Sequence, residues 1–175
     1  MSLTVLIIVV SAALVAGWWL SGVLRDRLER AQVIDHPNAR SLHDAPVPRG
    51  GGLAIALVVL SVHAGLLLTE QLDWVTGSVW WLVATGFATL GWLDDLKPRS
   101  ASVRLLVQCV LATIFVAMVV PLYKHAGGSI ATLISYPLLV LALVWAVNVF
   151  NFMDGADGFA GVQTLLAMSI GAALV

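Results

Sequence analysis

Long apolar runs alternate with shorter polar segments along the 175 residues of the chain. Five of these runs are each close to the ~20 residues that an α-helix needs to cross a bilayer. They cover residues 3–23, 52–68, 77–93, 104–120 and 132–150, and a sixth starts near Gly161 and reaches Val175. The pattern predicts an all-α protein, a polytopic transmembrane helical bundle with about five full spans and a truncated sixth.

The two ends of the chain shape this prediction further. The first run lacks a basic segment before it and a clean small-residue cleavage site, so we expect a retained span rather than a signal peptide. The sequence stops inside an apolar stretch without a polar tail. We therefore expect residues 1–175 to form a single integral membrane domain, the N-terminal part of a longer fold.

Composition agrees with a membrane protein. Hydrophobic residues make up 60% of the chain, against about 45–50% in soluble domains. The single cysteine, Cys109, excludes a disulfide within the chain. We expect contact with membrane lipid and no nucleic-acid partner.

The basic residues are unevenly distributed among the connections between spans. Most lie in or beside the first, third and fifth connections: Arg25, Arg27, Arg30, Arg40, Arg49, Lys97, Arg99 and Arg104. Only Lys124 lies in an even-numbered connection. Cytoplasmic loops are enriched in Lys and Arg, so we expect the odd-numbered connections in the cytoplasm and the N-terminus outside.

Two adjacent carboxylates, Asp94 and Asp95, follow the third run. Adjacent carboxylates repel each other, which favours recruitment of a divalent cation, and hard oxygen ligands suit Mg²⁺. The alternative is an ordinary polar stop after a span. A purely structural role is less well supported, because the C-terminal end of a helix disfavours anions.

A second polar segment follows the fifth run. Asn151, Asp154 and Asp157 recur at a spacing of three, so on a helical turn they would share a face. Gly155 and Gly158 permit close backbone approach. The alternative is an Asx-rich loop, and the spacing of an EF-hand is absent. The two amides Asn148 and Asn151 and the two carboxylates at a membrane boundary favour a functional role.

A third motif, Pro48-Arg49-Gly50-Gly51-Gly52, precedes the second run. Glycine amides at a helix N-terminus bind anions, and arginine adds a bidentate phosphate donor. The alternative is a flexible entry into the membrane with a charged anchor. Arg104 opens the fourth span, where it would reach either a phosphate or the lipid headgroups.

Together these segments resemble the polyprenyl-phosphate N-acetylaminosugar-1-phosphate transferases, glycosyltransferase family 4. The matching pieces are DHPNARSLHDAPVPRGGGLAI (35–55), GWLDDLKPRSASVRLLVQ (91–108) and NVFNFMDGADGFAGVQ (148–163). The PRGGG form is more similar to enzymes that initiate O-antigen or related surface glycans than to the muropeptide transferase, whose segment usually reads TPTMGG. The muropeptide branch also has a lysine three residues after its aspartate pair, whereas Lys97 comes two after.

The resemblance implies transfer of a sugar-1-phosphate from a UDP-N-acetylaminosugar to undecaprenyl phosphate, with release of UMP. It implies Mg²⁺, or Mn²⁺, as the cofactor, and an active site on the cytoplasmic face of a bacterial inner membrane. A homodimer is left open.

The resemblance also assigns roles residue by residue. Asp94 matches a base or lipid-phosphate-handling group, Asp95 lies close to the metal, and Asn151 matches a Mg²⁺ ligand. Asp154 and Asp157 match the pair that lines the nucleotide-sugar site, with Asp157 counted among the catalytic residues. The substrate-binding candidates beside Asp154 are Arg49, Gly51 and Arg104.

A different class of protein fits the same composition. A transporter or scaffold subunit would also bind an anionic substrate through polar groups inside the membrane. Transporter sites lie near the bilayer midplane. The polar motifs of this chain lie at span ends instead, which favours the enzyme.

Overall fold

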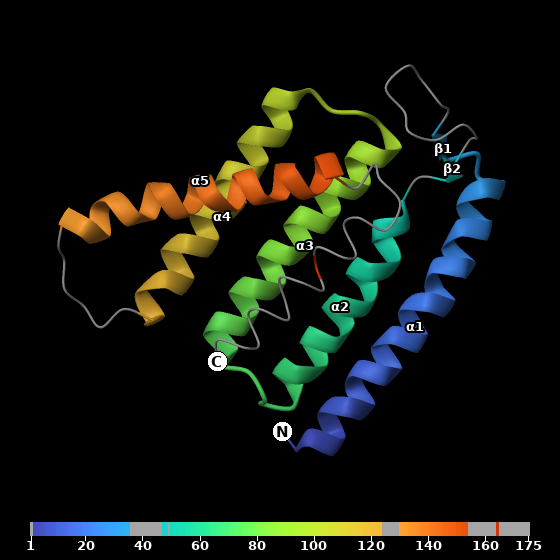
Figure 1. Ribbon diagram of the computed structural model, residues 1–175, viewed down its shortest axis with the longest axis horizontal. Coiled ribbons are helices and arrows are strands. Elements are labelled where there is room, and N and C mark those ends of the chain that lie inside the picture. The colour runs from blue at the N-terminus through green and yellow to red at the C-terminus, as the bar shows by residue number, and fades with distance from the viewer. Residues whose placement is uncertain (1, 36–46, 49, 124–129, 154–163, 165–175) are drawn as a thin grey trace.

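A computed structural model describes residues 2–35, 47–48, 50–123, 130–153 and 164. Its helices are α1 (Leu3–Arg30), α2 (Gly51–Leu68), α3 (Trp74–Leu96), α4 (Ala101–Tyr123) and α5 (Ile130–Met153), and two short strands are β1 (Ile34–Asp35) and β2 (Val47–Pro48) (Figure 1). Each of the five full predicted spans lies within one helix, so the predicted helical bundle is confirmed. The predicted sixth span lies outside the described residues.

Each helix packs on the next one along the chain. Figure 1 shows α1, α2 and α3 side by side, with successive helices running in opposite directions. In the same view α5 lies across α4 at a steep angle. The C-terminal ends of α1, α3 and α5 therefore meet the N-terminal ends of α2 and α4 at one end of the bundle.

In the part of the chain that the structure describes, four helices are long and apolar enough to cross a membrane: α1, α2, and segments of α4 and α5. Their large apolar side chains point outward, as a lipid-facing surface requires. Trp18 on α1, for example, is 81% exposed. The protein is a multi-pass membrane protein. The predicted third span is present as α3 but is not among these four helices.

Two reciprocal hydrogen bonds join α2 to α3. His63 Nε2 donates to the Gly77 carbonyl oxygen at 2.9 Å, and Trp81 Nε1 donates to the Leu60 carbonyl oxygen at 3.1 Å. In hydrocarbon such bonds add specificity that apolar packing alone does not supply. A small core of Val79, Val83, Phe87, Leu111 and Phe115 then packs α3 on α4.

The connection between α1 and α2 is tied to the end of α3. β1 and β2 pair antiparallel, with Ile34 opposite Pro48, a pairing that the sequence did not predict. Gly50 has φ 91°, and a Cβ there would lie 2.7 Å from the Trp92 ring. Glycine is therefore required at the entry into α2 for both conformation and space.

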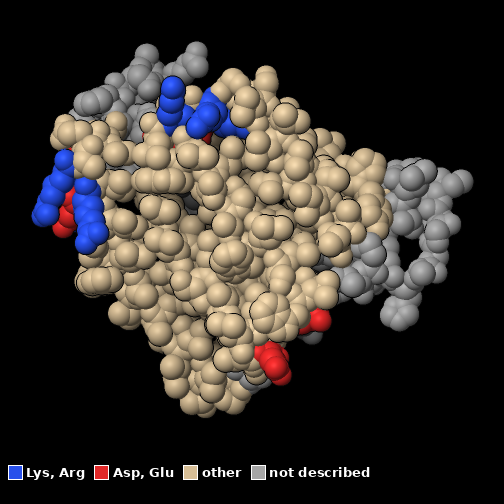
Figure 2. All heavy atoms as spheres, turned by 180° about the vertical axis from the view of Figure 1, so that it is seen from behind, with Lys and Arg blue, Asp and Glu red and all other residues tan. Residues whose placement is uncertain are grey.

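Charged residues lie at the two ends of the bundle. Figure 2 shows the basic side chains toward one end with some acidic ones among them, further acidic side chains at the opposite end, and a broad uncharged band between. Among the described residues, the basic ones are at the C-terminal end of α1 and around the α3–α4 junction: Arg25, Arg27, Arg30, Lys97, Arg99 and Arg104. Glu70 and Asp73 lie between α2 and α3 at the other end. The helical part of α1 continues past the predicted span to Arg30 and carries three of these arginines.

Candidate functional site

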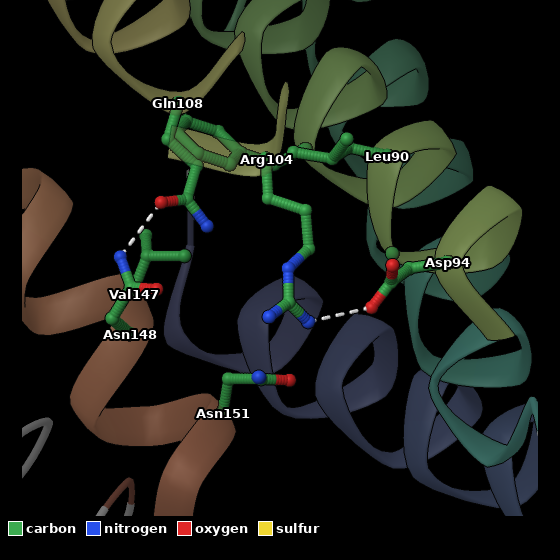
Figure 3. A pocket seen from close by; sticks show the side chains of 9 residues that line it. Leu90, Asp94, Arg104, Gln108, Val147, Asn148 and Asn151 are labelled. Carbon is green, nitrogen blue, oxygen red and sulfur yellow. Dashed lines mark hydrogen bonds and ion pairs between the residues drawn. The ribbon is translucent and has the colours of Figure 1, made fainter. Parts of the chain in front are cut away.

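A pocket of about 160 Å³ opens where α3, α4 and α5 converge. Figure 3 shows its polar side chains pointing inward from all three helices. Its lining is Phe87, Leu90, Gly91, Asp94, Arg104, Gln108, Val147, Asn148 and Asn151. The structure thus brings together residues from two sequence motifs that are far apart in the chain.

Asp94 stands in the last turn of α3, where the helix macrodipole disfavours an anion. Two contacts offset this. The Arg104 Nη1 group donates to Asp94 Oδ2 at 2.8 Å, and the Arg99 backbone N–H donates to Asp94 Oδ1 at 2.7 Å. Asp94 is therefore held by the α3–α4 connection and the first turn of α4 rather than by α3 itself, and its carboxylate is fixed at the pocket wall.

Arg104 lies in the first turn of α4, where a cation is equally disfavoured by the macrodipole. Its ion pair with Asp94 compensates both helix ends at once. The Arg104 side chain remains 37% exposed, and among the described residues Asp94 uses one of its several N–H groups. The rest of this fork faces the pocket, where it is available to an anionic ligand.

A carboxamide pair lies deeper between α4 and α5. Asn148 Nδ2 donates to Gln108 Oε1 at 2.7 Å and also to the Val144 carbonyl oxygen at 2.7 Å. Gln108 follows Arg104 by one helical turn on α4, and Asn148 precedes Asn151 by about one turn on α5. The pair therefore sets the register in which Arg104 and Asn151 face the same space.

Asn151 is in the last turn of α5, and its side chain extends toward Asp94 below the guanidinium of Arg104 (Figure 3). An amide oxygen and a carboxylate thus border one small cavity. Mg²⁺ keeps several water ligands and is usually bound through one or two carboxylates plus substrate phosphates. The oxygen donors of Asp94 and Asn151 fit such an ion. Within the described ranges no cluster of three His, Cys, Asp or Glu side chains forms a closed metal cage.

The remaining sequence candidates are distributed differently. Asp95 follows Asp94 on α3 and makes its own contacts, but it is not part of the pocket lining. Gly51 begins α2, and a Cβ there would meet open space. Arg49, Asp154 and Asp157 lie outside the described residues, so their predicted roles stay predictions.

Gln108 and Asn148 are pocket residues that lie within the matching pieces but received no individual role from the sequence. Gln108 is 6% exposed and is the buried polar side chain among the residues that the structure describes. One signal was present in the sequence: Gln108 interrupts an apolar run inside a predicted span. A polar side chain in such a position is a functional candidate by default.

Comparison with known proteins finds several similar transferases. The chain is 38% identical over 168 residues to a decaprenyl-phosphate N-acetylglucosaminephosphotransferase of Mycobacterium leprae, covering 86% of this chain and 40% of the relative. It is 32% identical over 143 residues to a probable undecaprenyl-phosphate N-acetylglucosaminyl 1-phosphate transferase of Bacillus subtilis, covering 78% and 38%. A phospho-N-acetylmuramoyl-pentapeptide-transferase of Synechococcus elongatus is 32% identical over 173 residues, covering 86% and 46%.

The chain thus spans less than half the length of these curated relatives. No solved structure matches it significantly. The model of one protein family, glycosyl transferase family 4, matches residues 78–175, which include every residue of the pocket. Because this match covers more than half of the chain, the protein belongs to glycosyl transferase family 4.

Proposed function

We propose that the protein transfers a sugar-1-phosphate from a UDP-N-acetylaminosugar to undecaprenyl phosphate, or a related polyprenyl phosphate, and releases UMP. The observation that carries this proposal is the pocket that joins Asp94, Arg104 and Asn151 in a chain of this family. The product would initiate O-antigen or another cell-surface glycan.

The reaction joins two phosphates. An oxygen of the lipid phosphate attacks the β-phosphorus of the UDP-sugar and forms a new P–O bond. The bond between this phosphorus and the bridging oxygen breaks, and UMP leaves with the electron pair. Phosphoryl transfer depends mainly on positioning and on charge neutralisation. The guanidinium of Arg104 supplies positive charge at the pocket, and its pairing with Asp94 fixes where that charge lies.

Mg²⁺ is the proposed cofactor, held by Asn151 and Asp95. Asp94, in the same cavity as Asn151, would act as the base or handle the lipid phosphate, and Asp157 would act at the nucleotide sugar. When bound, the ion would neutralise the charge of the diphosphate oxygens. Asp154 would contact the nucleotide sugar, while Arg49 would add a second phosphate donor at the start of α2. Gly51 would leave room for close approach of the substrate.

We also propose that this end of the bundle faces the cytoplasm of a bacterial inner membrane. The arginines and Lys97 around the pocket are on the side that the positive-inside rule assigns to the cytoplasm. In the proposed reaction the UDP-sugar comes from the cytoplasm, so this orientation places the pocket on the same side of the membrane as its donor. A transporter would place its polar groups nearer the midplane between helix halves, and the pocket at one end of the bundle gives that alternative no support.

The test is UMP release by the natural gene product in detergent or proteoliposomes. Undecaprenyl phosphate is supplied with UDP-N-acetylglucosamine, its galacto isomer or UDP-N-acetylmuramoyl-pentapeptide in separate assays. We expect UMP release that requires the lipid phosphate, one preferred donor, and Mg²⁺ or Mn²⁺.

Three controls define the outcome. Omission of the lipid phosphate measures simple hydrolysis of the donor, and EDTA followed by excess Mg²⁺ measures dependence on the ion. Correctly inserted protein that releases no UMP from any donor would contradict the proposed function. Full activity in EDTA would instead contradict the role given to Mg²⁺ alone.

A further inference from the structure

The buried side chain of Gln108 is oriented by a chain of hydrogen bonds that starts at a backbone carbonyl. The Val144 oxygen can only accept, so the Asn148 atom that contacts it must be the amide nitrogen. That same nitrogen contacts Gln108 at 2.7 Å, so the Gln108 atom there must be the acceptor, Oε1. The Nε2 group of Gln108 is therefore forced to the opposite side.

That opposite side is the pocket. Gln108 lines it, and Figure 3 shows its nitrogen directed toward the space beside the Arg104 guanidinium. Within the described residues Nε2 has no protein partner, although the side chain is 6% exposed. A buried N–H group without an acceptor is unfavourable. A ligand oxygen at this point would remove the deficit.

The charges around this point define the ligand. Gln108 Nε2 and the Arg104 fork are donors on one face of α4, separated by one helical turn. The carboxylate in the pocket lining, Asp94, is already paired with Arg104. Two convergent sets of donors, one of them a guanidinium with further N–H groups, suit an anion that has several acceptor oxygens.

We propose that Gln108 binds substrate directly, by donating its Nε2–H to a phosphate oxygen, and that Asn148 is a positioning residue that holds Gln108 in this orientation. The inference rests on the proposed function for the source of the phosphate, either the lipid phosphate or the diphosphate of the nucleotide sugar. The hydrogen-bond polarity itself is independent of that function.

Four variants test the proposal in the natural gene product. Gln108→Met keeps the length of the side chain and removes the donor. Gln108→Glu keeps the acceptor for Asn148 and replaces the donor with a carboxylate oxygen. Asn148→Asp offers Gln108 only an acceptor, so Gln108 should rotate and direct Oε1 into the pocket. Gln71→Met, in the exposed α2–α3 connection, is the matched control.

KM and kcat are measured separately for the lipid phosphate and for the UDP-sugar. We expect Gln108→Met to raise one of the two KM values by about 10-fold with little change in kcat, because the bond is formed in the ground state and kept in the transition state. Gln108→Glu should raise the same KM by about 100-fold or more, because the new charge repels phosphate. The KM that changes identifies the substrate whose phosphate Gln108 contacts.

The orienting role of Asn148 has its own test. Asn148→Asp should raise the same KM as Gln108→Met. The double variant should have a KM little higher than that of either single variant, because Asn148 acts by orienting Gln108. Fully additive effects would contradict the positioning role. If Gln108→Met had the same KM values as Gln71→Met for both substrates, the Gln108 contact would be overturned. The contact would also be overturned if Gln108→Met raised both KM values equally and lowered the thermal stability of the protein.

A binding measurement separates this proposal from the proposed function. Inorganic pyrophosphate should raise the thermal unfolding temperature of the solubilised wild type and raise that of Gln108→Met less. The shift in unfolding temperature requires no turnover, so it tests the contact between Gln108 and the anion even if the protein uses none of the UDP-sugars as a donor. Equal stabilisation of the two proteins would contradict the contact.

Discussion

The two ends of α3 each carry an aspartate, and the two residues are held in opposite ways. Asp73 precedes the first turn of α3, and its Oδ2 atom accepts from the Thr76 backbone N–H and the Thr76 hydroxyl, both at 2.9 Å. Asp94 lies in the last turn and is held by Arg99 and Arg104, which belong to the next segment of the chain. The first is a local helix cap, whereas the second depends on tertiary structure.

The difference separates a structural carboxylate from a functional candidate. Asp73 lies where the macrodipole favours an anion, and bonds from Thr76 hold the pKa of Asp73 below its ordinary value, the backbone amide contributing most. Asp94 lies where the macrodipole opposes it, beside a pocket, and needs a cation from another helix. An acid kept in an unfavourable position against a cavity is better explained by chemistry than by helix stability.

The largest contrast expected between the two ends is their side of the membrane. In a Cys109→Ala background, Ser102→Cys near the pocket should react in intact cells only with thiol reagents that cross the membrane. Gln71→Cys, in the α2–α3 connection, should react with impermeant reagents. Both positions are exposed, so access through the bilayer is the variable. The reverse pattern would place the pocket outside and remove the cytoplasmic assignment.

The next contrast is catalytic. Asp94→Asn keeps the shape of the side chain and removes the charge that pairs with Arg104, and it should lower kcat/KM for UMP release by at least about 100-fold, the low end for a positioned acid–base group. Asp73→Asn is the matched variant, because asparagine is an equally good N-cap, and it should stay within about 2-fold of wild type. Similar losses in both would show that the ends do not differ in function.

A smaller effect should show whether Asp94 and Arg104 act together. Arg104→Gln should lower kcat/KM by about 10-fold, modest for a charged hydrogen-bond donor because the Arg104 side chain is 37% exposed and its charge is partly screened. Combined with Asp94→Asn, it should cost less than the sum of the single effects. Strict additivity would mean that the ion pair in the structure has no part in the reaction.

The smallest effect concerns the cap itself. Because the folded state holds the pKa of Asp73 low, the ionised cap stabilises the fold above the unfolded-state pKa, and this contribution is lost as pH falls through the folded-state pKa. Asp73→Ala should therefore lower the thermal unfolding temperature slightly at pH 7. Its difference from wild type should shrink once the pH falls below the ordinary value of 3.8. Asp73→Asn cannot titrate, so its advantage over alanine should persist in acid.

The sequence predicted the helices well because a span has a strong and purely local signal. The run 52–68 became α2 almost without change, and 104–120 became the middle of α4. The boundaries moved outward where polar residues continue a helix beyond the apolar run, as in the last turns of α1. Hydropathy reports the apolar part of a helix and not its end.

The site was predicted only in part, for a related reason. Asp94, Arg104 and Asn151 were found as motif residues, and the structure places them around one pocket. Gln108 and Asn148 acquire their roles from a contact across 40 positions of sequence. The antiparallel pairing of β1 and β2 also depends on a long-range register that no short pattern encodes.

The reciprocal bonds between α2 and α3 have a consequence for biosynthesis. His63 and Trp81 each find their acceptor on the other helix of this pair, so the hairpin needs no later helix to satisfy them. A nascent chain can therefore settle these two helices against each other in the bilayer before the ribosome has released α4. α3, which carries Asp94, would then already have a defined orientation when α4 inserts and brings Arg104 to it.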